Sequence, residues 1–249
     1  MNHTDTGSGT PIVWIHGFPL SAAAWRDQLG IEGARHIVPD LPGFGGTPFD
    51  GGTMTMDDYA RACVSLLDAK GIDRAVFAGV SMGGYICLAI ARLFPERLKA
   101  LILVDTRELA DSDEAKQGRF DSIEKVRANG IGSVVDAMLP KMTTADAPQE
   151  LRDRVRTIMQ SATPEGVIAA LQAMAGRPDS SEIAGEIAVP TLVIVGDSDV
   201  ITPPADAQRM TALIPGAKLV TMVRAGHLSQ MERPAEFNAA VEQFLRELE

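Results

Sequence analysis

The residue pattern with the clearest chemical meaning is a serine between two glycines in residues 79–83, which read Gly-Val-Ser-Met-Gly. An apolar run at 75–78 precedes this pattern, and a second apolar run at 85–91 follows it. The order predicts a strand, a tight turn and a helix. In such a nucleophile elbow the strained backbone lifts the serine hydroxyl away from the chain. We therefore expect Ser81 to act as a nucleophile.

The same turn would also stabilise negative charge. Gly79 and Gly83 lack a Cβ, so a strand and a helix can approach closely around the serine. The helix that begins at Met82 directs unpaired amides and the positive end of its dipole to this place. Acyl transfer needs two amides around the developing oxyanion. We expect the amide of Met82 to supply one, and the amide of Phe18, in the turn 16–19 after the first strand, to supply the other.

A serine hydroxyl is a weak nucleophile and needs a base, and the chain contains four histidines. His227 directly follows the last predicted strand, at the sheet edge where Ser81 is expected. His16 ends the first strand and could shape a loop by hydrogen bonding. His36 begins a strand, and His3 lies in a polar N-terminal tail that we expect to be mobile. These placements favour His227 as the base.

Three aspartates qualify as the acid that orients this base. Each follows a predicted strand, and sites in parallel sheets collect at the carboxyl ends of strands. The chain order serine, acid, histidine admits all three as well. We favour Asp199 because the loop through 202–204 can turn its carboxylate toward His227. Asp197 is expected to tie down the turn, and Asp105 remains the alternative acid.

These side chains need a framework of alternating strands and helices. Continuous rather than alternating apolar runs indicate parallel strands covered on both faces, and therefore an α/β fold with a mostly parallel sheet flanked by helices. Strands are expected at 11–15, 35–38, 75–78, 100–104, 190–195 and 218–223, and helices at 21–29, 55–70, 82–94, 204–213 and from 234 onward.

The pattern changes between residues 107 and 186, where no strand-like run occurs. This segment predicts a helical insertion that divides a core made of 1–106 and 187–249. Its expected helices lie at 112–129, 131–139, 149–161 and 164–175.

Composition narrows the possible partners. The net charge of −10 disfavours nucleic acid and anionic membrane surfaces, so a small molecule is the expected ligand. The two cysteines, Cys63 and Cys87, predict neither a disulfide framework nor a zinc cluster. The chain begins without a signal-peptide pattern, and no apolar run reaches membrane-spanning length, so we expect a cytoplasmic protein.

The glycine-rich turn 43–46 lacks the lysine of a P-loop and the spacing of a dinucleotide fingerprint. No cofactor or metal is expected.

Five stretches together resemble the α/β-hydrolase family, in order and over nearly the whole chain. They are 16–19 (His-Gly-Phe-Pro), 40–45 (Asp-Leu-Pro-Gly-Phe-Gly), 79–84 (Gly-Val-Ser-Met-Gly-Gly), 196–199 (Gly-Asp-Ser-Asp) and 226–227 (Gly-His). The resemblance implies that Ser81, Asp199 and His227 form a catalytic triad. It also implies that 107–186 is a helical cap inserted after the sixth strand of the family.

Within the family the chain most resembles the branch of carboxylesterases and 3-oxoadipate enol-lactonases. It departs from this pattern in two respects. The turn 16–19 (His-Gly-Phe-Pro) differs from the one that enol-lactonases tend to carry, and only about ten residues precede the first predicted strand. We therefore expect the N-terminal antiparallel hairpin to be reduced or absent.

The expected activity is that of a cofactor-free serine hydrolase that cleaves a small carboxylic ester or lactone through an acyl-enzyme. The same residues would also suit a hydrolase of carbon–carbon bonds or a perhydrolase, because pocket shape decides between them. A non-catalytic ligand-binding protein on this fold is the alternative of another class. Dehalogenase and epoxide hydrolase branches would call for aspartate at position 81.

Overall fold

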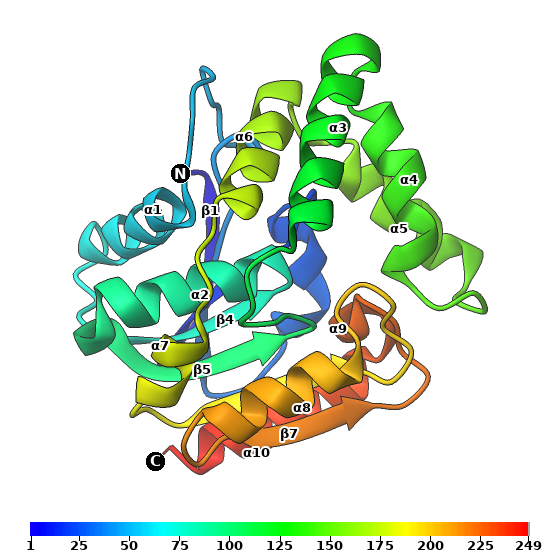
Figure 1. Cartoon of the computed structure of the whole chain (residues 1–249). Helices are drawn as coiled ribbons and strands as arrows, with labels where there is room; N and C mark the ends of the chain where they lie inside the picture. Colours follow the sequence, from blue (N-terminus) through cyan, green and yellow to red (C-terminus); the bar gives the residue numbers. More distant parts are fainter. Residues whose placement is uncertain (249) are drawn as a thin grey trace.

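A computed structural model describes residues 1–248. Within this range the strands form a seven-stranded sheet with the order β1-β3-β2-β4-β5-β6-β7 (Figure 1). β1 is antiparallel to β3, and all other neighbouring strands are parallel. The predicted mostly parallel sheet is therefore confirmed. The strands are β1 (His3–Gly7), β2 (Thr10–Ile15), β3 (Ala34–Pro39), β4 (Ala75–Val80), β5 (Leu98–Val104), β6 (Thr191–Gly196) and β7 (Lys218–Met222).

The N-terminal residues are more ordered than the sequence predicts. The expectation of a mobile tail at His3 is wrong, since His3 begins β1 and pairs with Pro39 of β3. The Asp5 carboxylate also accepts hydrogen bonds from Arg35 at 2.9 and 2.8 Å. An edge strand faces solvent and needs no apolar run, which is why a polar segment can form one. The reduced N-terminal hairpin is thus a single antiparallel strand.

Helices cover both faces of the sheet. Residues of α1, α2, α7 and α8 pack in one hydrophobic cluster, and residues of η1 and α10 pack in a second cluster on the other face. The helices of these layers are η1 (Ala22–Gln28), α1 (Met56–Asp68), α2 (Met82–Leu93), η2 (Pro95–Arg97), α7 (Ser181–Glu186), α8 (Pro204–Leu213), α9 (Ser229–Glu232) and α10 (Pro234–Arg246). The short helix α7 was not predicted from the sequence.

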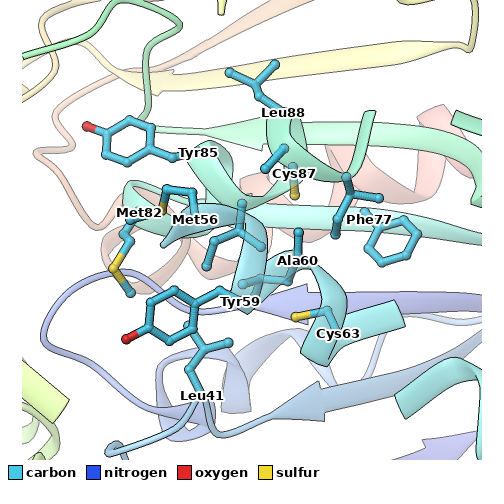
Figure 2. Packing of buried hydrophobic residues seen from close by; sticks show 14 of the residues in the cluster. Leu41, Met56, Tyr59, Ala60, Cys63, Phe77, Met82, Tyr85, Cys87 and Leu88 are labelled. Carbon is cyan, nitrogen blue, oxygen red and sulfur yellow. The ribbon is translucent and has the colours of Figure 1, made fainter. Parts of the chain in front are cut away.

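Figure 2 shows how closely α1 and α2 pack over β4. Tyr59 and Cys63 of α1 lie in the same cluster as Met82 and Cys87 of α2 and Phe77 of β4, and all five side chains are fully buried. Burying apolar area in this way provides the main stabilisation of the fold. It also fixes the start of α2 relative to the end of β4.

Four further helices separate β5 from α7. They are α3 (Asp113–Asn129), α4 (Gly132–Met142), α5 (Gln149–Met159) and α6 (Pro164–Ala175), and they gather to one side of the sheet (Figure 1). Gly43 in the loop after β3 contacts the start of α6, where its carbonyl accepts a hydrogen bond from the Thr163 amide at 2.9 Å. α7 instead packs against α2 and α8. Among the described residues, no helix combines the length and apolar character needed to cross a membrane.

Candidate active site

Ser81 occupies a strained turn between β4 and α2. Its φ of 55° and ψ of −116° lie outside the regions that side chains ordinarily adopt, which costs about 1–3 kcal/mol. The flanking glycines permit this geometry. A Cβ on Gly79 would lie 2.2 Å from the Gly83 carbonyl oxygen, and a Cβ on Gly83 would lie 2.2 Å from the carbonyl oxygen of Ile15. Only glycine fits at these two positions.

Neighbouring strands hold the strained serine in place. The Ser81 amide donates to the Val104 carbonyl at 2.9 Å, and the hydroxyl of Thr106 donates to the Ser81 carbonyl at 2.8 Å. Val104 is the last residue of β5, and Thr106 lies two residues after it. The backbone of Ser81 is thereby fixed while its partly exposed side chain stays free to react.

His227 reaches the serine from the loop after β7. Its Nε2 lies 2.9 Å from Ser81 Oγ, and its Nδ1 lies 2.8 Å from Asp199 Oδ2. The imidazole is buried. The loops that carry Asp199 and His227 touch, because a Cβ on Gly196 would lie 2.3 Å from the Gly226 carbonyl oxygen. The structure thus brings together the serine, the favoured base and the favoured acid.

The Asp199 carboxylate is buried and surrounded by donors. Oδ1 accepts from the amides of Ile201 and Thr202 at 2.7 and 3.0 Å, and Oδ2 accepts from the Thr202 hydroxyl at 2.6 Å. Desolvation raises the pKa of Asp199, but the charge and hydrogen bond of His227 together with the Thr202 bonds outweigh it, and the pKa is lowered. Asp199 is therefore held as a carboxylate. The sequence analysis uses Thr202 only as part of the loop 202–204. The structure shows that its amide and its hydroxyl both donate to the Asp199 carboxylate.

Opposing effects set the basicity of His227. Burial lowers its pKa, while the negative charge of Asp199, the hydrogen bond to Asp199 and the charge of Asp105 raise it. The net effect is a raised pKa. This arrangement favours the protonated imidazole that forms when a base removes a proton from serine.

The other two candidate acids lie elsewhere. Asp197 is exposed, and its carboxylate accepts from the hydroxyl of Ser198 at 2.8 Å. Asp105 is fully buried, but its carboxylate accepts from Gly196 and Ser229. Within residues 1–248 neither carboxylate makes a hydrogen bond to His227.

The turn after β2 lies directly against the serine. A Cβ on Gly17 would lie 3.1 Å from the Ser81 Cβ and 3.0 Å from the Val80 carbonyl oxygen. Within residues 1–248, the amides of Phe18 and Met82 donate to no other group. Met82 is the first residue of α2, where amides have no partner inside the helix. Both predicted oxyanion donors therefore belong to segments that flank the serine turn.

His16 shapes this turn and does not approach the nucleophile. Its Nε2 accepts from the Leu41 amide at 3.0 Å, so the ring proton is on Nδ1, which donates to the Gly17 carbonyl at 2.9 Å. Burial lowers the pKa of His16 to about 4. His36 accepts a hydrogen bond from the indole of Trp14, and the Nδ1 of His3 lies 3.0 Å from the Met1 carbonyl oxygen. The latter two histidines lie away from Ser81.

A cavity of about 270 Å³ opens between α3 and α4 above Phe18. Its lining includes Ser122 of α3, Ser133 and Met138 of α4, and Leu171 of α6. The lining also includes Arg119 and Lys125, so it combines apolar side chains and hydroxyls with two cationic groups, and the volume suits a small organic molecule. Among the described residues, no group of three or more His, Cys, Asp or Glu side chains could hold a metal ion.

Comparison with solved structures and curated proteins supports one family. A thermophilic esterase from Thermogutta terrifontis, solved with malate bound, is 38% identical with a TM-score of 0.96, over 99% of this chain and 93% of the esterase. The 3-oxoadipate enol-lactonase 2 of Acinetobacter baylyi is 27% identical over 94% of this chain and 88% of the lactonase. A 2-hydroxy-6-oxo-2,4-heptadienoate hydrolase of Pseudomonas putida is 29% identical over 98% of this chain and 92% of that enzyme.

A further relative is longer than this chain. The dihydrolipoyllysine-residue acetyltransferase component of the acetoin cleaving system of Pseudomonas putida is 31% identical over 96% of this chain, which spans 64% of its length. The profile of the alpha/beta hydrolase fold matches residues 10–234. The chain therefore belongs to the α/β-hydrolase family, and it is a hydrolase similar to the esterases and enol-lactonases of that family.

Proposed function

We propose that this hydrolase cleaves small carboxylic esters or lactones through an acyl-enzyme. The observation that carries the proposal is the continuous chain of hydrogen bonds from Ser81 through His227 to Asp199, with contacts of 2.9 and 2.8 Å. Nucleophile, base and orienting acid are thereby aligned for acyl transfer. The similarity to an esterase and an enol-lactonase supports the same substrate class.

In the first half-reaction His227 Nε2 takes the proton of Ser81 Oγ while this oxygen attacks the carbonyl carbon. The carbonyl oxygen becomes an oxyanion, which the amides of Phe18 and Met82 stabilise. Asp199 stabilises the imidazolium and holds its tautomer. Collapse of the tetrahedral intermediate breaks the bond to the alcohol oxygen, which takes the proton from His227.

In the second half-reaction a water molecule attacks the acyl carbon. His227 takes one proton from this water, and a second oxyanion forms in the same position. Its collapse releases the carboxylic acid, and the proton returns from His227 to Ser81. For a lactone the departing alcohol stays attached to the acyl group, so one hydroxy acid is released.

We also propose that residues 107–186 act as a cap that sets the size of the substrate. The cavity between α3 and α4 supports this, because its floor is Phe18 and its walls belong to the inserted helices. A volume of about 270 Å³ fits a short acyl chain or a small ring. The proposed chemistry uses only side chains and amides of the protein, so we expect no cofactor.

We also propose that the protein is cytoplasmic. Cys63 and Cys87 are buried free thiols, as expected in a reducing compartment. The net charge of −10 supports a small-molecule substrate over nucleic acid or an anionic membrane.

Hydrolysis of a carbon–carbon bond is the second candidate activity. The relative from Pseudomonas putida that is named as a 2-hydroxy-6-oxo-2,4-heptadienoate hydrolase supports it. Perhydrolysis with the same residues, and ligand binding without turnover, are the remaining alternatives.

Short-chain p-nitrophenyl esters test the main proposal. The purified protein should release nitrophenol over many turnovers, and the Ser81→Ala variant should release none. Circular dichroism should show that the variant keeps the parent fold. The absence of turnover in the parent protein contradicts the ester proposal. Cleavage of a vinylogous diketone acid would then support the carbon–carbon hydrolase, whereas stoichiometric retention of ligand without product would support a binding protein.

A further inference from the structure

Asp105 joins the two loops that carry the acid and the base. Its Oδ1 accepts a hydrogen bond from the Gly196 amide at 2.8 Å, three residues before Asp199. Its Oδ2 accepts from the amide and the hydroxyl of Ser229 at 3.1 and 2.6 Å, two residues after His227. One side chain is therefore hydrogen-bonded to both loops.

The surroundings fix Asp105 tightly. Its amide donates to the Ile194 carbonyl of β6 at 2.9 Å, and its side chain is fully buried. Its φ of 42° lies in the left-handed region, which a non-glycine residue adopts only when other contacts enforce it. A residue that served only to end β5 would need neither the strain nor a buried carboxyl group.

The donors around Asp105 suit the ionised form. Each carboxylate oxygen accepts one backbone N–H, and an N–H group can only donate. Burial and the negative charge of Asp199 oppose ionisation and raise the pKa of Asp105 to about 7, even though His227, Ser229 and Gly196 lower it. The hydrogen-bond donors on both oxygens thus oppose the effect of burial on this carboxyl group.

Three charged groups act on the buried imidazole. Asp199 contacts Nδ1, Asp105 adds a second negative charge, and Arg107 opposes both by lowering the pKa of His227. Ser81 and Thr202 are the neutral polar contacts. When the imidazole accepts the Ser81 proton, its positive charge forms in a buried place where charges interact strongly.

We propose that Asp105 is a positioning residue that clamps the His227 loop to the Asp199 loop and favours the imidazolium by its charge. It acts through His227 and does not touch the substrate. The proposal rests on the proposed serine hydrolase function.

Two variants separate the clamp from the charge. Asp105→Asn keeps the size of the side chain but removes the charge and replaces one accepting oxygen by an NH2 group, which cannot accept from the Gly196 or Ser229 amide, whereas Ser229→Ala removes only the hydroxyl hydrogen bond and keeps the carboxyl group. The measurement is kcat/KM against pH for a p-nitrophenyl ester. Because catalysis needs the neutral imidazole, loss of the Asp105 charge should move the acidic limb to lower pH. We expect kcat to fall roughly 10- to 100-fold in Asp105→Asn, because the two loops no longer hold His227 and Asp199 in their relative positions.

Ser229→Ala should lose less activity, and because its hydroxyl hydrogen bond only contributes to lowering the pKa of Asp105, its acidic limb should move less than that of Asp105→Asn. A parent-like kcat in Asp105→Asn, or an unshifted limb with a reduced kcat, overturns the proposal. Failure of the ester-hydrolase function would look different, because the parent protein itself would then be inactive.

A second measurement needs no substitution of Asp105. In 15N-labelled parent protein, the amides of Gly196 and Ser229, which bond to the Asp105 carboxylate, should exchange slowly with deuterated solvent. Fast exchange of both amides overturns the clamp even where Asp105→Asn fails to fold.

Discussion

Ser81 Oγ and His227 Nε2 lie 2.9 Å apart, although 146 positions separate the two residues in the chain. Ser81 follows β4 and His227 follows β7, and β5 and β6 lie between these strands in the sheet. The loop after β7 closes the gap by running back across the strand ends. The Ser198 amide donates to the Ala225 carbonyl at 2.9 Å, and the Ser229 hydroxyl donates to Asp105. Backbone and side-chain contacts between loops thus bring His227 to Ser81.

Asp199→Asn should lower kcat by about 10⁴-fold without unfolding the protein, because an amide no longer holds the imidazole in the required tautomer. Steady-state kinetics with a p-nitrophenyl ester and a thermal melt measure the two effects. Asp197→Asn is the matched control, since this carboxylate is exposed and should leave kcat near the parent value. Near-parent activity in Asp199→Asn would remove Asp199 from the mechanism.

Gly83→Ala should lower the free energy of unfolding by about 1–3 kcal/mol, because its Cβ would meet the Ile15 carbonyl oxygen at 2.2 Å. The displaced α2 would also move the Met82 amide and reduce kcat. Gly118→Ala is the control, because no atom lies within 4 Å of its Cβ position, and alanine should stabilise α3 by up to about 1 kcal/mol. Urea denaturation of both variants compares them. Equal stabilities would contradict the close contact at Gly83.

The acidic limb of kcat/KM should lie above the usual imidazole pKa of about 6.5. Burial lowers the pKa of His227, but the charge and hydrogen bond of Asp199 together with the charge of Asp105 outweigh this effect, so the net pKa is raised. The imidazole must be neutral to accept the Ser81 proton. Activity should therefore fall as pH decreases, beginning at a higher pH than for free imidazole. Rates measured in constant-ionic-strength buffers check this. A limb well below 6.5 would contradict the raised pKa.

Both cysteines should be unreactive in the native protein. Burial raises the pKa of Cys63 to about 12, and burial likewise raises the pKa of Cys87, so neither forms the reactive thiolate at neutral pH. Titration with dithionitrobenzoate should detect no thiol before unfolding and two after addition of guanidinium. Iodoacetamide should leave ester hydrolysis unchanged. Loss of activity with this reagent would show an accessible thiol near the site.

Local sequence patterns predict the elements and single out Ser81 as the candidate nucleophile. The pattern at 204–213 predicts α8 with the observed bounds, and the run before residue 81 predicts β4. The serine turn is also local, because Gly79 and Gly83 are needed wherever a strand and a helix meet this closely around a strained residue. Short-range sterics and apolar periodicity act over neighbouring residues, so they can be read without a structure.

Contacts in the folded protein select the aspartate that bonds to His227. Asp105, Asp197 and Asp199 all follow strands, and the loop 202–204 favours Asp199 without excluding Asp105. The amides of Ile201 and Thr202 turn the Asp199 carboxylate toward Nδ1, while Gly196 and Ser229 hold Asp105 beneath the loops. The strand β1 and the helix α7 were likewise missed, because each depends on the neighbour it packs against. Contacts between residues distant in sequence fix these features, and a single sequence does not encode them in its local pattern.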